Sequence, residues 1–467
     1  MMAGAFLAIA VLELIGAAVF TLLCAEPKRW GLAGKLGLSF GLGLVGLTVS
    51  LFLLSWGGIK PAWWLGVLVM IALWAAAFGF RRGQLAAWRP EKSARRSPPP
   101  KGWEKILEWT LLAFIAGICA VVSAVSLLEP LVEWDVLAIW AMKAKVLLHE
   151  PASLSGYFTD VSKAYSHLDY PLLWPMAMAW VWTWTDQSDL LAVKALAPAL
   201  LCSIVALFFG LLRRKHSRTH ALVFTALLAG VPMLLSQTSR LMSDAPLALF
   251  VMGAFICCYL WLESSHPDDL RLAGVLAAGM LFTKNEGIGL LAILALIAAM
   301  AIVAQRRMKL FVPAVVWLAA VPLLLTAVWF VFRLGIPKVH EDYGGRINPV
   351  HFLTNASRGP EVLSGSLGVL GNWNDWLLLW PLAALGLAVA PMNWLRRPGI
   401  YLFLAATLPL LMYGYVYVVS PWDLKELMET TANRLLLHVT PLWVFFLAEQ
   451  AEAAQLLPFG RPSRTRG

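Results

Sequence analysis

The chain has 467 residues, of which 60% are hydrophobic and only 14% charged, and its mean hydropathy is +0.72. Soluble domains are about 45–50% apolar and about 25% charged, so this composition excludes an ordinary soluble enzyme, a disordered chain and a collagen-like fibre. The formal net charge of +10 informs membrane topology here rather than nucleic-acid binding, because in a membrane protein the position of each Lys and Arg matters more than the sum.

Long apolar stretches predict an all-α polytopic membrane protein with about 13 transmembrane helices. We read the first stretch as a retained helix and not a signal peptide, because it lacks a basic start and is interrupted by Glu13. The expected spans, in chain order, are 3–24, 34–55, 62–80, 109–128, 190–212, 221–237, 245–262, 272–283, 287–304, 311–333, 373–390, 399–420 and 435–454.

The apolar segment 171–186 is ambiguous, and the distribution of basic residues decides its placement. If it does not cross, the loops on one side hold roughly 24 of the Lys and Arg residues and the other side about 13, whereas a crossing reduces the split to about 20 against 17. The segment is also short and Trp-rich, with Pro171 and Pro175 near one end. We therefore predict an interfacial helix, an outer N-terminus and an inner C-terminus.

Three regions follow along the chain. Residues 1–108 form an N-terminal three-helix membrane segment with a basic, Pro-rich cytoplasmic loop at 89–105, residues 109–454 form the main membrane domain, and 455–467 form a basic cytoplasmic tail. Two long outer loops, 129–189 and 334–372, concentrate the acidic residues, which indicates that the working site faces outward. The five cysteines lie in apolar segments without metal-ligand spacing, which argues against disulfides and a zinc site.

The first long loop begins with a predicted amphipathic helix over 134–148 that rests on the membrane surface, with Lys143 and Lys145 between its apolar positions. Asp135 stands at the start of this helix. It is either a helix N-cap or a catalytic carboxylate, and Glu133 competes for the catalytic assignment.

Asp244 stands at the outer end of the span 245–262, close to Arg240. Pro246 follows in the first turn, so Asp244 can be an N-cap or a functional acid. Both interpretations remain open from the sequence.

Between the spans 272–283 and 287–304, Lys284, Asn285 and Glu286 interrupt what would otherwise be one apolar run. Charged groups at this depth are costly unless they face a cavity or each other. We expect Lys284 to bind a phosphate and Glu286 to bind sugar hydroxyls, although a simple turn explains the same residues. Arg434, directly before the last span, is either a snorkelling anchor or a ligand for a lipid phosphate.

Other polar residues of the outer loops are weaker candidates. His167 and Asp169 could bind a divalent metal, but no third ligand is evident. Tyr170 follows them, and Tyr343 and Arg346 belong to a polar stretch in the second long loop that could bind an acceptor.

Together these motifs resemble the polytopic glycosyltransferases of the GT-C superfamily, especially the bacterial members similar to protein O-mannosyltransferases and lipid A aminoarabinose transferases. The matching strings are WDVLAIWAMKAK, HLDYPLLWP, SDAPLALF, FTKNEG and NRLLLHVTPL, in this order within 109–450. The first-loop motif holds a lone Asp135 beside Glu133, not the paired acids of several such families.

The resemblance implies transfer of a sugar from a polyprenyl-phosphate donor to a lipid, glycan or protein acceptor at the periplasmic face of a bacterial inner membrane. Asp135 would then be the general base of an inverting displacement, and Lys284 and Arg434 would stabilise the leaving phosphate. Asp244 would orient Lys284 or the acceptor. Membrane lipids are expected partners, nucleic acid is not, and no cofactor is certain, although a divalent metal is possible.

Two other functions remain open. One is a flippase or transporter for a lipid-linked sugar. The other is an O-antigen ligase or polymerase that uses a diphosphate-linked donor, for which the loop 334–372 offers Arg346, Arg358, His340 and His351.

Overall fold

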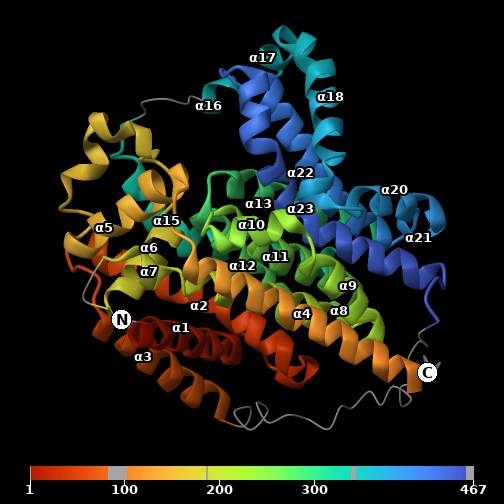
Figure 1. Ribbon diagram of the computed structural model, residues 1–467, viewed down its shortest axis with the longest axis horizontal. Coiled ribbons are helices and arrows are strands. Elements are labelled where there is room, and N and C mark those ends of the chain that lie inside the picture. Colours follow the sequence, from red (N-terminus) through yellow and green to blue (C-terminus); the bar gives the residue numbers. More distant parts are fainter. Residues whose placement is uncertain (1, 83–101, 186–187, 338–342, 459–467) are drawn as a thin grey trace.

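The computed structural model describes residues 2–82, 102–185, 188–337 and 343–458, and the regular structure within these ranges is entirely helical (Figure 1). In this part of the chain nine helices are long and apolar enough to cross a membrane, or ten if one bent pair counts as a span. The predicted class, an all-α polytopic membrane protein, is thereby confirmed. The number thirteen stays a prediction.

Helix α11 (Asp244–Ser264) forms the centre of the protein, and its apolar stretch is completely buried. Because α11 is hydrophobic on every side, it can be surrounded by other helices. Its neighbours are α12 (Pro267–Thr283), α23 (Leu424–Ala453) and α8 (Leu196–Arg213). The start of α11 therefore lies beside the end of α12 and a segment of α23.

The N-terminal helices pack onto this core through small residues. Helix α1 (Met2–Leu23) crosses α2 (Leu32–Trp56) so closely that a Cβ on Gly16 would lie 1.6 Å from the Ser39 carbonyl oxygen. Helix α2 crosses α8 with Gly34 against Gly210, where a Cβ on Gly210 would lie 2.3 Å from Cα of Gly34. Small residues at such crossings let membrane helices approach closely.

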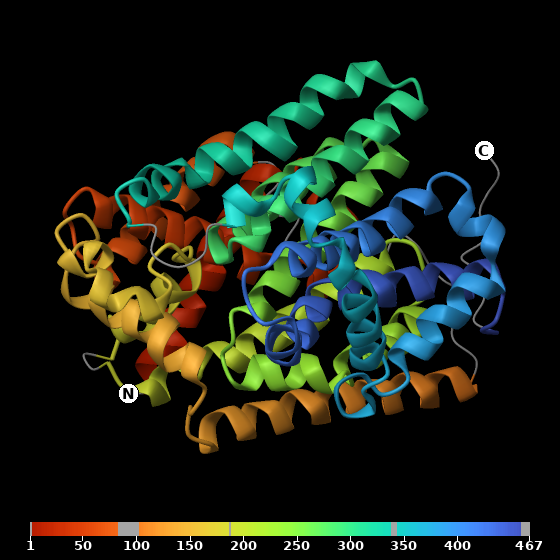
Figure 2. The same cartoon turned by 90° about the horizontal axis from the view of Figure 1, so that it is seen from above.

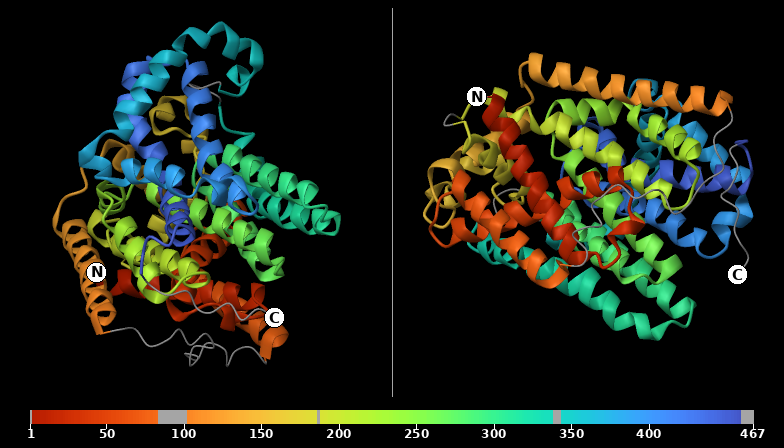
Figure 3. Two further views of the ribbon diagram at one scale, coloured as in Figure 1. Left: turned by 90° about the vertical axis from the view of Figure 1, so that its right-hand side faces the viewer. Right: turned by 90° about the horizontal axis from the view of Figure 1, so that it is seen from below.

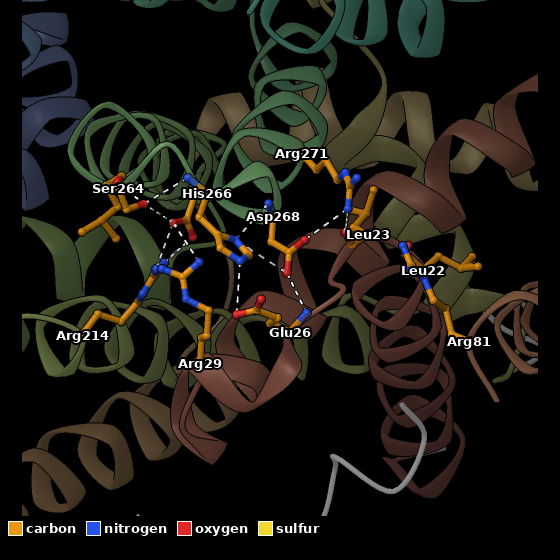
Figure 4. Close-up of polar contacts among 12 residues, drawn as sticks. Leu22, Leu23, Glu26, Arg29, Arg81, Arg214, Ser264, His266, Asp268 and Arg271 are labelled. Carbon is orange, nitrogen blue, oxygen red and sulfur yellow. Dashed lines mark hydrogen bonds and ion pairs between the residues drawn. The ribbon is translucent and has the colours of Figure 1, made fainter. Parts of the chain in front are cut away.

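A buried polar network at the other end of α11 also attaches the N-terminal segment (Figure 4). The backbone N–H of Glu26 donates to Asp268 Oδ2 at 2.8 Å, and Arg271 bridges Asp268 and the Leu23 carbonyl. Arg214 forms a two-pronged pair with Asp269. These contacts join the α1–α2 connection to the start of α12.

Helix α4 (Gly102–Leu128) runs along one side of the molecule against α8, α9 and α10 (Figure 2). On another side α13, α14 and α15 project from the body (Figure 3).

The remaining helices are α3 (Trp63–Arg81), α5 (Met142–His149), α6 (Leu173–Trp182), α7 (Leu190–Val193), α9 (Arg218–Ala229), α10 (Pro232–Ser239), α13 (Glu286–Ala304), α14 (Phe311–Val315), α15 (Val321–Arg333), α16 (Tyr343–Arg346), α17 (Pro349–Thr354), α18 (Gly359–Leu370), α19 (Trp373–Trp376), α20 (Leu379–Val389), α21 (Pro391–Leu395) and α22 (Gly399–Val419).

The ambiguous segment 171–186 forms the short helix α6, whose ten residues are all buried inside the protein. Ten residues rise about 15 Å, which is too short to span a bilayer. Its tryptophans face protein rather than lipid headgroups: the indole N–H of Trp180 donates to the Ala8 carbonyl at 2.9 Å, and that of Trp174 to the Leu241 carbonyl at 2.7 Å. The segment was expected to be a helix that rests on the membrane surface. In the structure it packs inside the protein instead.

Two other expected elements differ. The span 221–237 is the pair α9 and α10, bent by 63° where Pro232 begins the second helix. The last helix begins at Leu424, eleven residues before the expected 435, because Asp423 caps it by accepting from the Glu426 N–H at 3.0 Å. Most of the basic loop 89–105 and most of the tail 455–467 lie outside the described residues.

Candidate active site

Asp244, at the first position of α11, is completely buried and is surrounded by three basic side chains. Its Oδ1 accepts from Lys284 Nζ at 2.8 Å and lies 3.0 Å from Nε2 of His438, and its Oδ2 accepts from Arg434 Nε at 2.9 Å. Both carboxylate oxygens are therefore used by side chains, and the N-cap interpretation of Asp244 is wrong. One buried acid therefore fixes the position of Lys284, in the turn between α12 and α13, and of Arg434 and His438 in α23.

Lys284 lies where α12 stops and α13 has not begun, in extended backbone conformation. Its ammonium also contacts Glu286 Oε1 at 3.1 Å. Burial alone would lower the pKa of Lys284, but the carboxylates of Asp244 and Glu286 outweigh burial and raise the pKa above its ordinary value. Lys284 is therefore a fixed positive charge, and two of its three N–H donors have partners in the described structure.

Arg434 connects the two acids that the sequence placed in this site. Its Nε donates to Asp244, and its Nη1 contacts Asp135 Oδ2 at 2.8 Å. The structure gives Nη2 no partner among the described residues, and about a fifth of the side chain is exposed. Arg434 belongs to the third turn of α23 and does not precede the helix. It is thus held on two sides, and its Nη2 group remains available.

The sequence pattern did not single out His438, which the structure places beside Asp244. It follows Arg434 by four positions in α23, so both side chains lie on one helix face. Because an ionised carboxylate only accepts, His438 Nε2 donates to Asp244, and Nδ1 pairs with the Tyr413 hydroxyl at 2.9 Å. The i, i+4 spacing was the signal that could have found it.

Asp135 begins a short π-helical segment, Asp135–Ala141, that leads into α5. It is not an N-cap, because Trp134 holds that position and no side chain caps the segment. One of its oxygens contacts Arg434, while the other has no partner among the described residues. A partly exposed carboxylate oxygen therefore lies beside the available guanidinium N–H.

The first long loop meets the Lys284 turn through Asp169. Its Oδ2 accepts from Arg333 Nη2 at 2.7 Å and from Asn285 Nδ2 at 3.4 Å. His167 instead stacks on Tyr170, with ring centroids 4.6 Å apart. Asp169 and His167 therefore make different contacts, and among the described residues no third ligand lies close enough to complete a metal site with them.

Lys143 contradicts the amphipathic pattern expected for 134–148, because it is completely buried rather than on a polar face. Its ammonium lies 5.9 Å from the Trp140 ring and 5.7 Å from the Tyr170 ring and donates to the His167 carbonyl. Burial lowers the pKa of Lys143 to about 7, although Asp169 opposes this shift. Lys143 thus supports the fold of the loop from inside.

Several predicted residues lie away from Asp244. Glu133 contacts Arg240 at 3.1 Å in a partly exposed pair. Arg346 contacts only His351 among the described residues, at 3.4 Å, and the side chain of Tyr343 lies outside the part that the structure describes. The same holds for His340, whereas Arg358 donates to the carbonyls of Ser420 and Trp422 and so holds the end of α22.

Buried polar atoms without a partner among the described residues lie next to three residues of the Asp244 cluster. They are Ser243 Oγ, Asn285 Oδ1 and Asn433 Oδ1, which adjoin Asp244, Lys284 and Arg434 in sequence. A buried polar atom without a hydrogen bond is costly.

The structure thus brings together Asp135, Asp244, Lys284 and Arg434, which belong to four of the sequence strings quoted for the resemblance. Residues 169–332 match the dolichyl-phosphate-mannose-protein mannosyltransferase family. The match covers Asp169, Asp244 and Lys284, and it supports a membrane glycosyltransferase of the GT-C type, as the sequence resemblance predicted. No curated protein matches the chain.

Proposed function

We propose that the protein transfers a sugar from a polyprenyl-phosphate donor to an acceptor at the outer, periplasmic face of a bacterial inner membrane. The observation that carries the proposal is the continuous contact from Asp135 through Arg434 and Asp244 to Lys284. These residues come from four distant segments and meet at the ends of membrane helices. Such a place suits a donor whose lipid tail lies in the bilayer and whose sugar lies outside it.

Arg434 and Lys284 bind the donor phosphate in this mechanism. Lys284 has one N–H donor and Arg434 has three left after their contacts with the carboxylates, and the planar guanidinium is suited to phosphate oxygens. As the glycosidic bond breaks, negative charge accumulates on the leaving phosphate. Cations that are already held in place by Asp244 stabilise this charge without reorganising.

Asp135 accepts the proton of the attacking group. The acceptor oxygen or nitrogen forms a bond to the anomeric carbon, the bond from that carbon to the phosphate oxygen breaks, and its electron pair leaves on the phosphate. The acceptor proton moves to the free oxygen of Asp135. A single displacement of this kind inverts the anomeric configuration, since no carboxylate forms a covalent intermediate.

Asp244 is a positioning residue in this proposal rather than a catalytic one. Both of its oxygens are taken by the three basic side chains, and it has no exposed surface. Glu133 pairs with Arg240 at the rim, so Asp135 is the better base. In this proposal Glu286 and Asn285, which adjoin Lys284 in the turn, bind sugar hydroxyls.

The alternatives have less support. Arg358 of the second long loop is used to hold backbone carbonyls, which weakens the case for a ligase that binds diphosphate there. A flippase would need no base beside its phosphate ligands, whereas Asp135 lies directly beside Arg434.

The test is turnover by the purified, detergent-solubilised protein with a panel of labelled polyprenyl-phosphate and polyprenyl-diphosphate sugars. We expect release of polyprenyl phosphate from one monophosphate donor. Turnover of diphosphate donors alone would favour the ligase, and movement of an intact donor across proteoliposomes without turnover would favour the flippase.

A further inference from the structure

Exposed basic side chains gather at the end of α13 that is farthest from the candidate active site. This basic cluster consists of Arg306, Arg307, Lys309, Arg396 and Arg397. The α13–α14 connection that carries three of them forms the tip of the projection made by α13, α14 and α15 (Figure 2). From Glu286 to Ala304 helix α13 rises about 27 Å, close to the roughly 30 Å of a bilayer's hydrocarbon core. The basic cluster therefore belongs to the membrane face opposite Asp244.

Two connections that are distant in the sequence bring these cations together. Arg397, between α21 and α22, donates through Nη1 to the carbonyl of Ala304 at the end of α13. Arg307 donates through Nη1 to the Leu262 carbonyl and to the Ser265 hydroxyl, both at 3.1 Å. Two guanidinium groups are thus held in place at the ends of α11 and α13 by neutral oxygen atoms, which leave their positive charges uncompensated.

No carboxylate among the described residues forms an ion pair with the basic cluster. The side chains of Arg306, Lys309 and Arg396 also make no hydrogen bond within the described ranges. Five positive charges on two adjacent connections repel one another. An anion bound between them would lower the free energy of this surface.

The lack of carboxylate partners is not general at this end of the helices. Arg214 pairs with Asp269, and Lys215 pairs with Glu263 near the end of α11 at 2.8 Å. Arg307 reaches the same end of α11 and meets only neutral oxygens there among the described residues. The preference of membrane proteins for Lys and Arg on one side applies to all of these residues alike, so it does not explain the difference.

Exposed apolar side chains lie directly beside the cations. Met308 stands between Arg307 and Lys309, and Leu395 immediately precedes Arg396. Both apolar side chains are more than half exposed. A phospholipid joins an anionic phosphate to acyl chains, so it can contact the cations and the apolar groups together, whereas a soluble anion can contact only the cations.

We propose that the basic cluster binds the headgroup of an anionic phospholipid, such as phosphatidylglycerol, in the leaflet opposite the candidate active site. Arg307 and Arg397 keep N–H donors beyond those used on neutral oxygens, and the planar guanidinium matches phosphate oxygens. Basic pockets between membrane helices are a known form of site for anionic headgroups. The bound lipid would join the α13–α14 connection to the α21–α22 connection. This site does not depend on the proposed sugar transfer.

The test is native mass spectrometry of the full-length protein, delipidated in a neutral detergent and titrated separately with phosphatidylglycerol, phosphatidylcholine and sodium phosphate. We expect the wild type to bind the first phosphatidylglycerol at least about tenfold more tightly than phosphatidylcholine, because each cation near the headgroup attracts its charge. The combined variant Arg306→Gln, Lys309→Gln and Arg396→Gln removes three charges without removing a side-chain contact to the described residues. It should lose this preference.

The matched control combines Lys60→Gln, Lys105→Gln and Lys425→Gln, which removes the same net charge from exposed residues outside the basic cluster. It should bind phosphatidylglycerol within about twofold of the wild type. Equal weakening in the two triple variants would overturn the proposal, and so would a wild type that binds both phospholipids equally. Inorganic phosphate that binds as tightly as phosphatidylglycerol would also overturn it, because the occupant would then be a soluble anion.

Discussion

Replacing Asp244 with Asn tests the proposed role of the buried carboxylate most severely. The amide keeps the shape of the side chain and removes its charge, which leaves Lys284 and Arg434 without their shared partner. Lys284 is 6% exposed and Asp244 fully buried, and removing one partner of such a buried pair costs about 3–5 kcal/mol. We therefore expect the free energy of unfolding to fall by at least about 3 kcal/mol in Asp244→Asn.

The matched control is Glu133→Gln, which removes a carboxylate from the rim pair with Arg240. The Glu133 side chain is 31% exposed and the Arg240 side chain 56%. Loss of this pair should therefore change the free energy of unfolding by no more than about 1 kcal/mol. Both variants would be compared by equilibrium unfolding in mixed detergent micelles. Adding Lys284→Met to Asp244→Asn should recover part of the loss, because the double variant removes an uncompensated charge. If Asp244→Asn were as stable as Glu133→Gln, the proposed ion network would not be the element that holds the site.

Three other predictions follow from named contacts. Arg434→Lys should raise the donor KM about tenfold or more, because one ammonium cannot replace a guanidinium that bonds two carboxylates and, in the proposal, a phosphate. Each hydrogen bond to a charged group contributes about 1.5–3 kcal/mol. The control Arg240→Lys should leave the donor KM unchanged. Gly16→Leu should abolish the monodisperse folded fraction on size-exclusion chromatography, because the Ser39 carbonyl oxygen occupies the space of a side chain there. Gly117→Leu should not, because a Cβ at Gly117 meets open space. Equal folded yields of the two variants would contradict the close crossing of α1 and α2. Burial lowers the pKa of Lys143 to about 7, so above that pH the unfolded state binds more protons than the folded state and the free energy of unfolding should rise from pH 7 towards 10. Lys143→Met should remove this rise. An unchanged slope in Lys143→Met would refute the prediction.

The sequence predicted the helical class, and it singled out Asp135, Asp244, Lys284 and Arg434, which the structure brings into contact. Charged side chains are rare within and beside long apolar runs, so these four were conspicuous among their neighbours. Which of them pair with each other could not be read from the chain, because Asp244 and Arg434 are 190 residues apart.

The errors have a common origin in tertiary packing. Lys143 was expected on a polar face, but the Trp140 and Tyr170 rings and the His167 carbonyl provide it with a buried site. His438 was hidden inside an apolar helix whose true start, at Leu424, lies before the expected span.

The central claim is that Asp135 takes the proton of the acceptor while Arg434 and Lys284 hold the donor. The most direct test measures donor binding and donor turnover together in the wild type and in Asp135→Asn. Our account predicts a donor Kd within about threefold of the wild type and a kcat at least about a hundredfold lower, the usual range for loss of a general base. Full turnover in Asp135→Asn would contradict it.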